Sequence, residues 1–498
     1  MSRIQEWYVG KTIFITGGTG FMGKVLVEKI LRSLPDVKKV ILLIRPKRGV
    51  DPMQRLENIK NLPVFARLKI ERPKALDKLV IIEGNLEVEN LGLTAADKRK
   101  LIEVSVVMHM AATLRLEAEV KDAVVANTIG TKMILDLCKN MKNLQCFIHL
   151  STAFCYPDKE ILDEKVYEPH RDPYEVMKYV QTENEEVLKR KMQEILGPHP
   201  NSYTFSKRLA EWLVKDYAKE YPVVIARPSV VIPTFREPMQ GWVDSLNGPI
   251  GVIAAAGKGV LRSMLCVESN LAQIIPCDLA INALLTIPTE REKTKDDMLV
   301  YNLNVPRNVV AISWGEILNL GQKIISQYPF EWMLWYPDGA LRTNVYIHWL
   351  VLILFQWIPA IFLDMLFFLI GRERFMIRVQ KKIMVGLDVL QYFTTRAWQF
   401  DTTNYEKMSY AVTGKDEEIF YHLNVTYDLT DYLTQTLLMV KKHIFKERFE
   451  NLPYIRLHYK FLWLLHNTIK FTFLGVMVLF VVRLLGIDVL LSRSCFHG

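Results

Sequence analysis

The chain has 498 residues, of which 50% are hydrophobic and 23% are charged. This composition excludes a disordered or fibrous protein, and the length predicts about three domains. The net charge of +9 is modest and dispersed along the chain, so no nucleic-acid partner is expected.

Short apolar runs alternate with helical periods through the first 230 residues. Strands are predicted at residues 12–16, 40–44, 79–83, 104–108, 146–150 and 223–226, and helices at 22–34, 127–140 and 202–220. Residues 157–200 are charged and helical in pattern, as an insert between the fifth strand and the next helix. This alternation predicts an α/β protein with a Rossmann-type doubly wound parallel sheet.

The rest of the chain changes character in two steps. Residues 230–340 are irregular in pattern, with many Pro and Gly turns, and from residue 345 the chain is helical and increasingly apolar. We therefore expect three successive domains. They are a nucleotide-binding domain with a substrate-binding portion at 1–344, a C-terminal helical domain at 345–460, and an apolar, membrane-attaching tail at 461–498.

A glycine-rich turn directly follows the first predicted strand. Gly17, Gly20 and Gly23 have the spacing G-x-x-G-x-x-G at the start of a helix, where backbone N–H groups and the helix dipole bind a pyrophosphate. A tight turn without a ligand is the alternative. The residues assigned here to cofactor binding are Thr16, Gly17, Gly18, Thr19, Gly20, Phe21, Met22 and Gly23.

Basic residues follow the second predicted strand. An acidic residue at this place would accept hydrogen bonds from the ribose of NAD, whereas arginine suits the 2′-phosphate of NADP. The chain has Arg45, Lys47 and Arg48 here. We therefore predict NADPH, bound through Arg45 and Lys47, with a solvated basic turn as the alternative.

Two pairs of residues have the chemistry of a carbonyl reductase. Tyr203 and Lys207 are four apart on a predicted helix and share a face, where an ammonium would favour ionisation of the phenol. Ser151 and Thr152 follow the fifth strand, so either hydroxyl can lie in the ligand crevice. His149, inside the same apolar strand, is interpreted as a core residue.

These motifs resemble the extended short-chain dehydrogenase/reductases, together with His109–Ala112 and Asn127–Thr131. By that resemblance Tyr203 is the proton donor, Lys207 its activator and ribose anchor, and Thr152 the hydroxyl that orients the carbonyl. Asn85 stands where the family usually has aspartate, and its amide oxygen can accept the same bond. Further cofactor contacts are assigned to Asn85, Leu86, Ala111, Asn127, Lys207 and Pro228.

A narrower resemblance is to the fatty acyl-CoA reductases, and among them to insect members. It covers both halves of the chain, through the segments 43–47, 227–231, 233–238, 241–249 and 393–401. The resemblance implies reduction of a long-chain fatty acyl-CoA to a primary alcohol by two NADPH, through an aldehyde and with release of CoA. A dehydrogenase of a sterol or another apolar alcohol, and a non-catalytic lipid-binding homologue, are the alternatives.

Two apolar stretches predict attachment to a membrane. Residues 345–370 are long enough to span, but Gln356, Pro359 and Asp364 favour two docked helices broken at the proline, or an interfacial hairpin. Residues 461–482 follow a basic flank, which predicts a short tail across the bilayer and catalytic domains facing the cytosol. Gly475, Arg483 and Asp488 leave a re-entrant or interfacial helix as an alternative, and a buried helix is another. The endoplasmic reticulum and the peroxisome both fit. The six cysteines include no Cys-x-x-Cys pair, so we expect no metal site and a reducing compartment.

Overall fold

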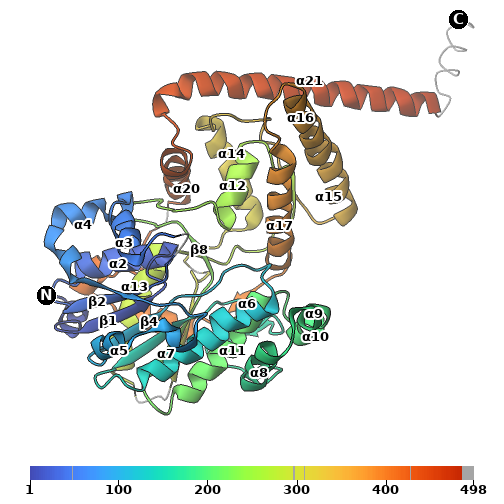
Figure 1. The fold of residues 1–498 in the computed structure, drawn as a ribbon. Coiled ribbons are helices and arrows are strands. Elements are labelled where there is room, and N and C mark those ends of the chain that lie inside the picture. The colour runs from blue at the N-terminus through green and yellow to red at the C-terminus, as the bar shows by residue number, and fades with distance from the viewer. Residues whose placement is uncertain (47–48, 295–297, 308, 427, 485–498) are drawn as a thin grey trace, which may run out of the picture. The chain divides into compact units, whose positions relative to one another are not determined.

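The computed structural model describes all residues except 47–48, 295–297, 308, 427 and 485–498 (Figure 1). The chain forms two compact units, each built from three separate stretches. Unit 1 comprises Met1–Asp244, Ser269–Trp314 and Asp388–Val440, and unit 2 comprises Ser245–Glu268, Gly315–Leu387 and Lys441–Gly498. These interleaved units cut across the three successive domains expected from the sequence, because segments distant in the chain pack together.

Unit 1 is built on a seven-stranded sheet in the order β11-β7-β5-β4-β1-β2-β3, with every neighbouring pair parallel. Its strands are β1 (Thr12–Thr16), β2 (Lys39–Ile44), β3 (Leu79–Glu83), β4 (Val106–His109), β5 (Cys146–Leu150), β7 (Val223–Pro228) and β11 (Met298–Leu303). The predicted doubly wound Rossmann sheet is confirmed. The sequence analysis missed only the edge strand β11 of this sheet.

Helices cover both faces of the sheet, so its central strands are apolar on both sides. Along β1, Ile13 and Ile15 pack on one face with α2 (Phe21–Ser33) and α13 (Cys277–Arg291). Phe14 packs on the other face with α7 (Gly130–Cys138) and α11 (Ser202–Tyr217). Figure 1 shows α7 and α11 together on one side of the sheet.

The region 230–340 is more regular than expected. It contains α12 (Pro249–Gly257), α13 and α14 (Trp314–Gln327). Nearly every residue of α13 is buried, including its polar residues Asp278, Asn282 and Thr286, so the helix lacks the exposed polar face of an amphipathic helix. The predicted helical insert is present as α8 (Pro173–Thr182), α9 (Glu185–Arg190) and α10 (Met192–Leu196).

Shorter elements complete unit 1. Before α7 the chain forms α6 (Val120–Val124) and a π-helical turn (Val125–Ile129), so the predicted helix 127–140 starts earlier and less regularly. Gln399–Phe400 (β13) pairs with Ile161–Leu162 (β6). The remaining helices are α1 (Arg3–Trp7), α3 (Pro52–Lys60), α4 (Ala66–Glu71), α5 (Ala95–Lys100), α18 (Thr403–Ala411), α19 (Lys415–Ile419) and α20 (Leu429–Met439), and the strands are β8 (Val230–Ile232) and β10 (Ile274–Pro276).

Unit 2 is mainly helical. One continuous helix, Val345–Leu369, consists of α15 (Val345–Leu352), a π-helical turn (Ile353–Trp357) and α16 (Ile358–Leu369). It is not broken at Pro359, because the proline lies in the first turn of α16 after the π turn. Next come α17 (Met376–Thr394), of which the part to Leu387 belongs to this unit, and α21 (Leu452–Leu484). Strands β9 (Ser263–Leu265) and β12 (Ala340–Arg342) pair in parallel.

Candidate active site

The glycine turn between β1 and α2 has the geometry of a dinucleotide site. Gly17 has a φ of +78°, and a Cβ there would lie 2.7 Å from the backbone nitrogen of Ala111. A Cβ on Gly23 would lie 2.2 Å from the carbonyl oxygen of Gly17. The N-cap residue Gly20 makes no side-chain hydrogen bond, so the first N–H groups of α2, at Phe21 and Met22, lack a side-chain acceptor. These residues fit a nicotinamide dinucleotide at the helix N-terminus.

Thr16, at the end of β1, fixes the neighbouring loop. Its Oγ1 lies 2.8 Å from Nδ1 of His109 and accepts from the Ala111 backbone N–H at 3.1 Å. His109 is fully buried, and burial lowers its pKa to about 3, so this imidazole is neutral. The loop after β4 is thereby held against the glycine turn.

Asn127 has a different position from the one expected. Its amide donates to the Thr113 carbonyl at 3.2 Å and to Ser206 Oγ at 3.0 Å, and its oxygen accepts from the Thr113 N–H at 2.8 Å. Both amide hydrogens are therefore used within the protein. Asn127 ties the loop after β4 to α11, and a contact of its own with the cofactor stays a prediction.

Two arginines lie beside the glycine turn. Arg45 follows β2 and pairs with Glu87 at 3.0 Å. Arg55, on α3, donates from Nη1 to the Arg45 carbonyl. Its Nη2 donates to Thr19 Oγ1 at 3.2 Å. Burial and the charge of Arg45 lower the pKa of Arg55, so an anion bound here would relieve a repulsion. The sequence analysis missed Arg55, and Lys47 lies outside the described residues.

Three further predicted cofactor residues lie at the carboxyl edge of the sheet or in its loops. The Asn85 side-chain oxygen accepts from the Glu87 N–H at 3.2 Å. Leu86 packs closely against Gly130: a Cβ on that glycine would lie 2.9 Å from the Cβ of Leu86. The carbonyl of Pro228, which ends β7, accepts from the Ala153 N–H at 3.0 Å. Contacts of these residues with a cofactor stay predictions.

Tyr203, Lys207 and Thr152 lie together at the carboxyl end of β5. The hydroxyl of Thr152 lies near the phenol of Tyr203 and favours its ionised form, which lowers the pKa of that phenol. The Nζ of Lys207 donates at 2.7 Å to the carbonyl of Leu150, which is the last residue of β5. Asn201 caps α11 by accepting from the Thr204 N–H at 2.9 Å, which fixes the first turn, where Tyr203 lies.

The expected lowering of the Tyr203 pKa by Lys207 is not what the structure shows. Burial raises the pKa of Tyr203 well above its usual value, and only the Thr152 hydroxyl opposes this. Burial also lowers the pKa of Lys207 to about 8, against the attraction of Glu211. Desolvation is the largest cause of the shift at Tyr203, which is a neutral phenol at neutral pH.

A buried ion pair lies next to Lys207. Glu211 and Arg227 have no exposed surface, and Arg227 Nη2 lies 2.6 Å from Glu211 Oε2. The carboxylate also accepts from the Tyr156 hydroxyl at 2.7 Å and from the Cys155 thiol at 3.2 Å. Sequence reasoning missed this pair, although Glu211 is four residues after Lys207 on the same helix.

The two hydroxyls after β5 point to different partners. Ser151 Oγ contacts Cys155 Sγ at 3.9 Å and lowers the pKa of Glu211, whereas Thr152 lies near Tyr203. His149 is fully buried in β5, and within the described residues neither of its ring nitrogens has a hydrogen-bond partner. The expected core position of His149 agrees with the structure, but the expectation that its ring nitrogens would be satisfied by hydrogen bonds does not.

The C-terminal motif 393–401 packs directly behind Thr152. Phe154 makes edge-to-face contacts with three aromatic rings, at centroid distances of 5.2 Å to Phe393, 5.1 Å to Trp398 and 5.5 Å to Phe400. This cluster is part of unit 1. It fixes the turn that carries the Thr152 hydroxyl.

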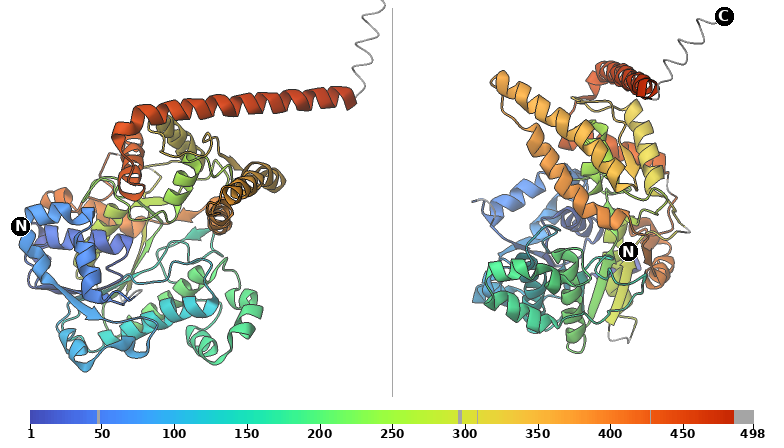
Figure 2. Two further views of the ribbon diagram at one scale, coloured as in Figure 1. Left: turned by 45° about the horizontal axis from the view of Figure 1, so that its top comes forward. Right: turned by 90° about the vertical axis from the view of Figure 1, so that its right-hand side faces the viewer.

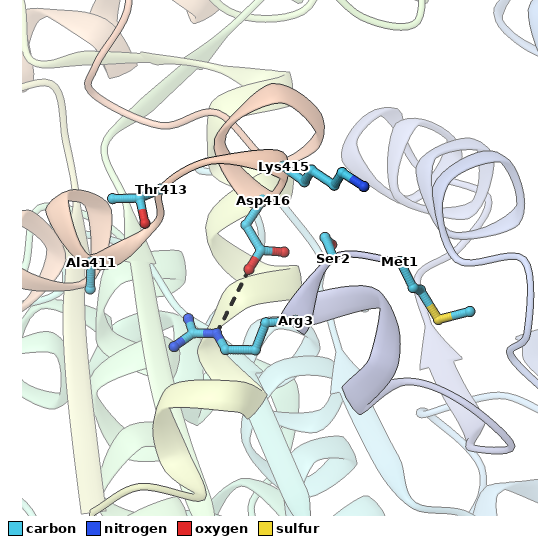
Figure 3. Close-up of a pocket in the computed structure, with 7 residues that line it drawn as sticks. All are labelled: Met1, Ser2, Arg3, Ala411, Thr413, Lys415 and Asp416. Atoms are coloured by element: carbon cyan, nitrogen blue, oxygen red, sulfur yellow. Dashed lines mark ion pairs between the residues drawn. The ribbon is translucent and has the colours of Figure 1, made fainter.

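A surface pocket of unit 1 lies elsewhere. It is lined by Met1–Arg3 and by residues between Ala411 and Asp416, and Arg3 and Asp416 form an ion pair of 3.7 Å across it (Figure 3). None of the residues assigned to catalysis or to the cofactor lines it. The contact ties the N-terminus to the segment after α18.

Comparisons with known proteins agree over nearly the whole chain. Two family descriptions, both reading "male sterility protein", match residues 15–284 and 355–447. "Fatty acyl-CoA reductase wat" of Drosophila melanogaster is 33% identical, covering 94% of this chain and 90% of that protein. "Fatty acyl-CoA reductase 1" of Gallus gallus is 32% identical, covering 100% and 96%.

Solved structures show the same fold. The terminal R domain of the myxalamid biosynthetic pathway is 18% identical with a TM-score of 0.58, covering 87% of this chain and 90% of that one. The reductase domain of a nonribosomal peptide synthetase from Mycobacterium tuberculosis is 14% identical with a TM-score of 0.57, covering 88% and 96%.

Proposed function

The chain belongs to the fatty acyl-CoA reductase family, and from this premise we propose that it reduces long-chain fatty acyl-CoA to a primary fatty alcohol with NADPH. The observation that carries the proposal is the contact between Thr152 and Tyr203 at the sheet edge that also bears the glycine turn. The family relationship does not favour the sterol dehydrogenase or the non-catalytic homologue.

Each residue of the site has a role in this reaction. A bound nicotinamide supplies the hydride in each of two reductions. Thr152 and Tyr203 bind the thioester oxygen, and Tyr203 gives it a proton as the negative charge develops there. When the resulting hemithioacetal collapses, Tyr203 takes that proton back and CoA leaves as the thiolate. In the second reduction Tyr203 protonates the alcohol oxygen.

Tyr203 keeps its phenolic proton at neutral pH. A phenol that stays neutral at neutral pH has its proton available for the substrate oxygen. Lys207, with a pKa of about 8, remains charged below that pH and binds the nicotinamide ribose in this proposal. Its bond to Leu150 keeps the ammonium at the end of β5.

The choice of NADPH over NADH rests on two guanidinium groups. Arg45 and Arg55 lie beside Thr19, and Glu87 pairs with only one of them. A 2′-phosphate would bring these two cations the counter-charge that the ribose hydroxyl of NADH lacks. Arg55 thus joins Arg45 in the proposed cofactor site.

Membrane attachment is proposed on the two apolar helices. Both Val345–Leu369 and Phe449–Arg483 are long and apolar enough to cross a bilayer, and the most apolar stretch of the second helix is not buried. We assign the residues of α21 after His466 to the lipid, with the catalytic unit on the cytosolic side. A fatty alcohol partitions into lipid, so attachment places the product at its destination.

Product analysis tests the proposal directly. Full-length protein, NADPH and a panel of acyl-CoAs should yield primary alcohols by mass spectrometry. Tyr203→Phe should lower the rate about 100-fold or more, because it removes the proton donor. Tyr217→Phe is the matched control, since Tyr217 lies on the same helix and its hydroxyl contacts Asp136. Accumulation of aldehyde alone would overturn the second reduction. No product from protein that binds NADPH would overturn the function.

A further inference from the structure

The helix Val345–Leu369 has an unusual distribution of side chains. Its large apolar residues are exposed along its whole length: Trp349 is 47% exposed, Phe355 49%, Phe362 54% and Phe368 63%. A helix of a soluble protein normally buries such residues and exposes its polar ones. This helix does the opposite.

Its polar residues face the interior of unit 2. His348, Gln356 and Asp364 are 4%, 2% and 4% exposed. His348 Nδ1 lies 2.7 Å from Ser263 Oγ, and the Gln356 oxygen accepts from the Arg262 N–H at 2.7 Å. All three side chains thus belong to the buried face.

Asp364 accepts three backbone hydrogen bonds. Its carboxylate accepts from the N–H groups of Phe375 at 3.0 Å, Met376 at 2.9 Å and Ile377 at 2.9 Å, at the start of α17. Gln356 also donates to the Gln380 oxygen at 3.1 Å. Figures 1 and 2 show α17 returning beside α15 and α16. The helix is therefore fixed in its rotation by hydrogen bonds along its length.

The π turn brings Gln356 toward the face of the helix that carries His348. Eight residues advance an α-helix by about 80° beyond two full turns, so this spacing would move Gln356 away from the face of His348. The π-helical turn Ile353–Trp357 has a wider hydrogen-bond ring and takes up an additional residue. The π turn thus directs Gln356 toward the buried face of the helix.

We propose that the exposed face of Val345–Leu369 docks in the plane of a lipid bilayer, at the boundary between headgroups and acyl chains. A spanning helix would have to bring His348, Gln356 and Asp364 into hydrocarbon and give up their hydrogen bonds to unit 2. An in-plane helix keeps these bonds and buries its apolar face about 5–10 Å deep. This inference adds to the proposed membrane attachment and is independent of the reaction.

Charge complementarity selects anionic lipid as the occupant. Directly after the helix, the exposed basic residues are Arg372, Arg374, Arg378, Lys381 and Lys382. Glu373 is the only acidic residue between 371 and 387, and it pairs with Arg378 at 2.9 Å. Exposed Lys and Arg beside an apolar face attract the anionic headgroups of a membrane surface.

Labelling of the two helix ends distinguishes docking from spanning. The full-length protein is expressed in cells, and sealed microsomes are treated with a membrane-impermeant maleimide. Thr343→Cys and Glu373→Cys place a thiol at an exposed position on each side of the helix. Docking predicts that both are modified at similar rates without detergent. Modification of one end only, until detergent is added, would overturn the proposal. The unsubstituted chain sets the background, because its described cysteines are buried.

Depth measurement tests the occupant. A fluorophore on Phe362→Cys should be quenched about twofold more by a spin label at carbon 5 of the acyl chain than at carbon 14, because the helix lies near the headgroups. The matched control is Ile70→Cys on α4, a fully exposed apolar position in unit 1, which should not be quenched. Stronger quenching at carbon 14 would overturn in-plane docking. If, without lipid, the fluorophore at residue 362 became less accessible to a soluble quencher as the protein concentration rose, the exposed face would instead bind a second copy of the chain.

Discussion

Helix α11 and the helix Val345–Leu369 both bury polar side chains, but their outer faces differ. In α11, Lys207 and Glu211 are buried beside the sheet, and the exposed residues include Lys215 and Asp216. In Val345–Leu369 the exposed residues are aromatic and aliphatic. Buried polar groups alone therefore do not identify a catalytic helix. The exposed residues indicate the environment of each helix. For α11 it is water, and for Val345–Leu369 we propose that it is lipid.

Breaking the buried ion pair of α11 should have the largest effect. Arg227→Leu leaves the Glu211 carboxylate buried without its charge partner, so the free energy of unfolding should fall by about 3–5 kcal/mol. Thermal unfolding by circular dichroism measures this. Lys38→Met, which removes a solvent-exposed pair with Glu103, is the control and should change stability by about 1 kcal/mol or less. Equal losses for both variants would contradict the assignment of Arg227 as structural.

The pH dependence of the reaction should report Lys207. Its pKa of about 8 means that the ammonium is charged below that pH and loses its proton above it. If the charge anchors the ribose, kcat/KM should fall about tenfold per pH unit above pH 8. Lys207→Arg should lose this alkaline limb, because a guanidinium stays charged. A limb that persists in that variant would belong to another group.

Removing Arg55 should sharpen the distinction between the two cofactors. A hydrogen bond to a charged group contributes about 1.5 kcal/mol or more, so Arg55→Ala should raise the KM for NADPH about tenfold. The KM for NADH should not change, because it has no 2′-phosphate. Lys60→Ala, on the same helix and paired with Glu57, serves as the control. A similar rise for both cofactors would argue against a phosphate contact.

The smallest effect is expected in unit 2. Asp364→Ala removes the acceptor for the first N–H groups of α17 and should cost about 1 kcal/mol of stability, as for other helix caps. Activity in detergent should be unchanged. Microsomal labelling at residue 373 should still occur, since the apolar face is intact. A loss as large as that of Arg227→Leu would remove the contrast between the two helices.

The sequence predicted the sheet better than the contacts between distant segments. The bounds of β1, β3 and β5 agree with the structure because each is a short apolar run bounded by turns. The position of Arg55 beside Thr19 was not foreseen, because it depends on how α3 packs against the glycine turn. Asn127 was predicted to contact the cofactor, and that stays a prediction, while the internal partners of its amide depend on α11.

The same reason explains the apolar helix. Gln356 and Asp364 were seen to oppose a spanning segment, but a break at Pro359 was expected, since the sequence does not reveal a π turn. The pairing of β13 with β6 was equally invisible, because more than two hundred residues separate them. Local patterns identify elements, whereas tertiary contacts decide their partners.

The interleaving of the two units has a consequence for protein synthesis. Residues 388–440 complete unit 1 but leave the ribosome only after most of unit 2 has been made. Until then, Phe154 lacks its aromatic neighbours and the amide of Asn302 lacks the Asp401 carbonyl, which it reaches at 2.8 Å in the finished protein. The nascent sheet therefore lacks these contacts until residues 388–440 have been synthesised. A premature stop codon before residue 388 therefore removes part of unit 1 as well as the C-terminal part of unit 2.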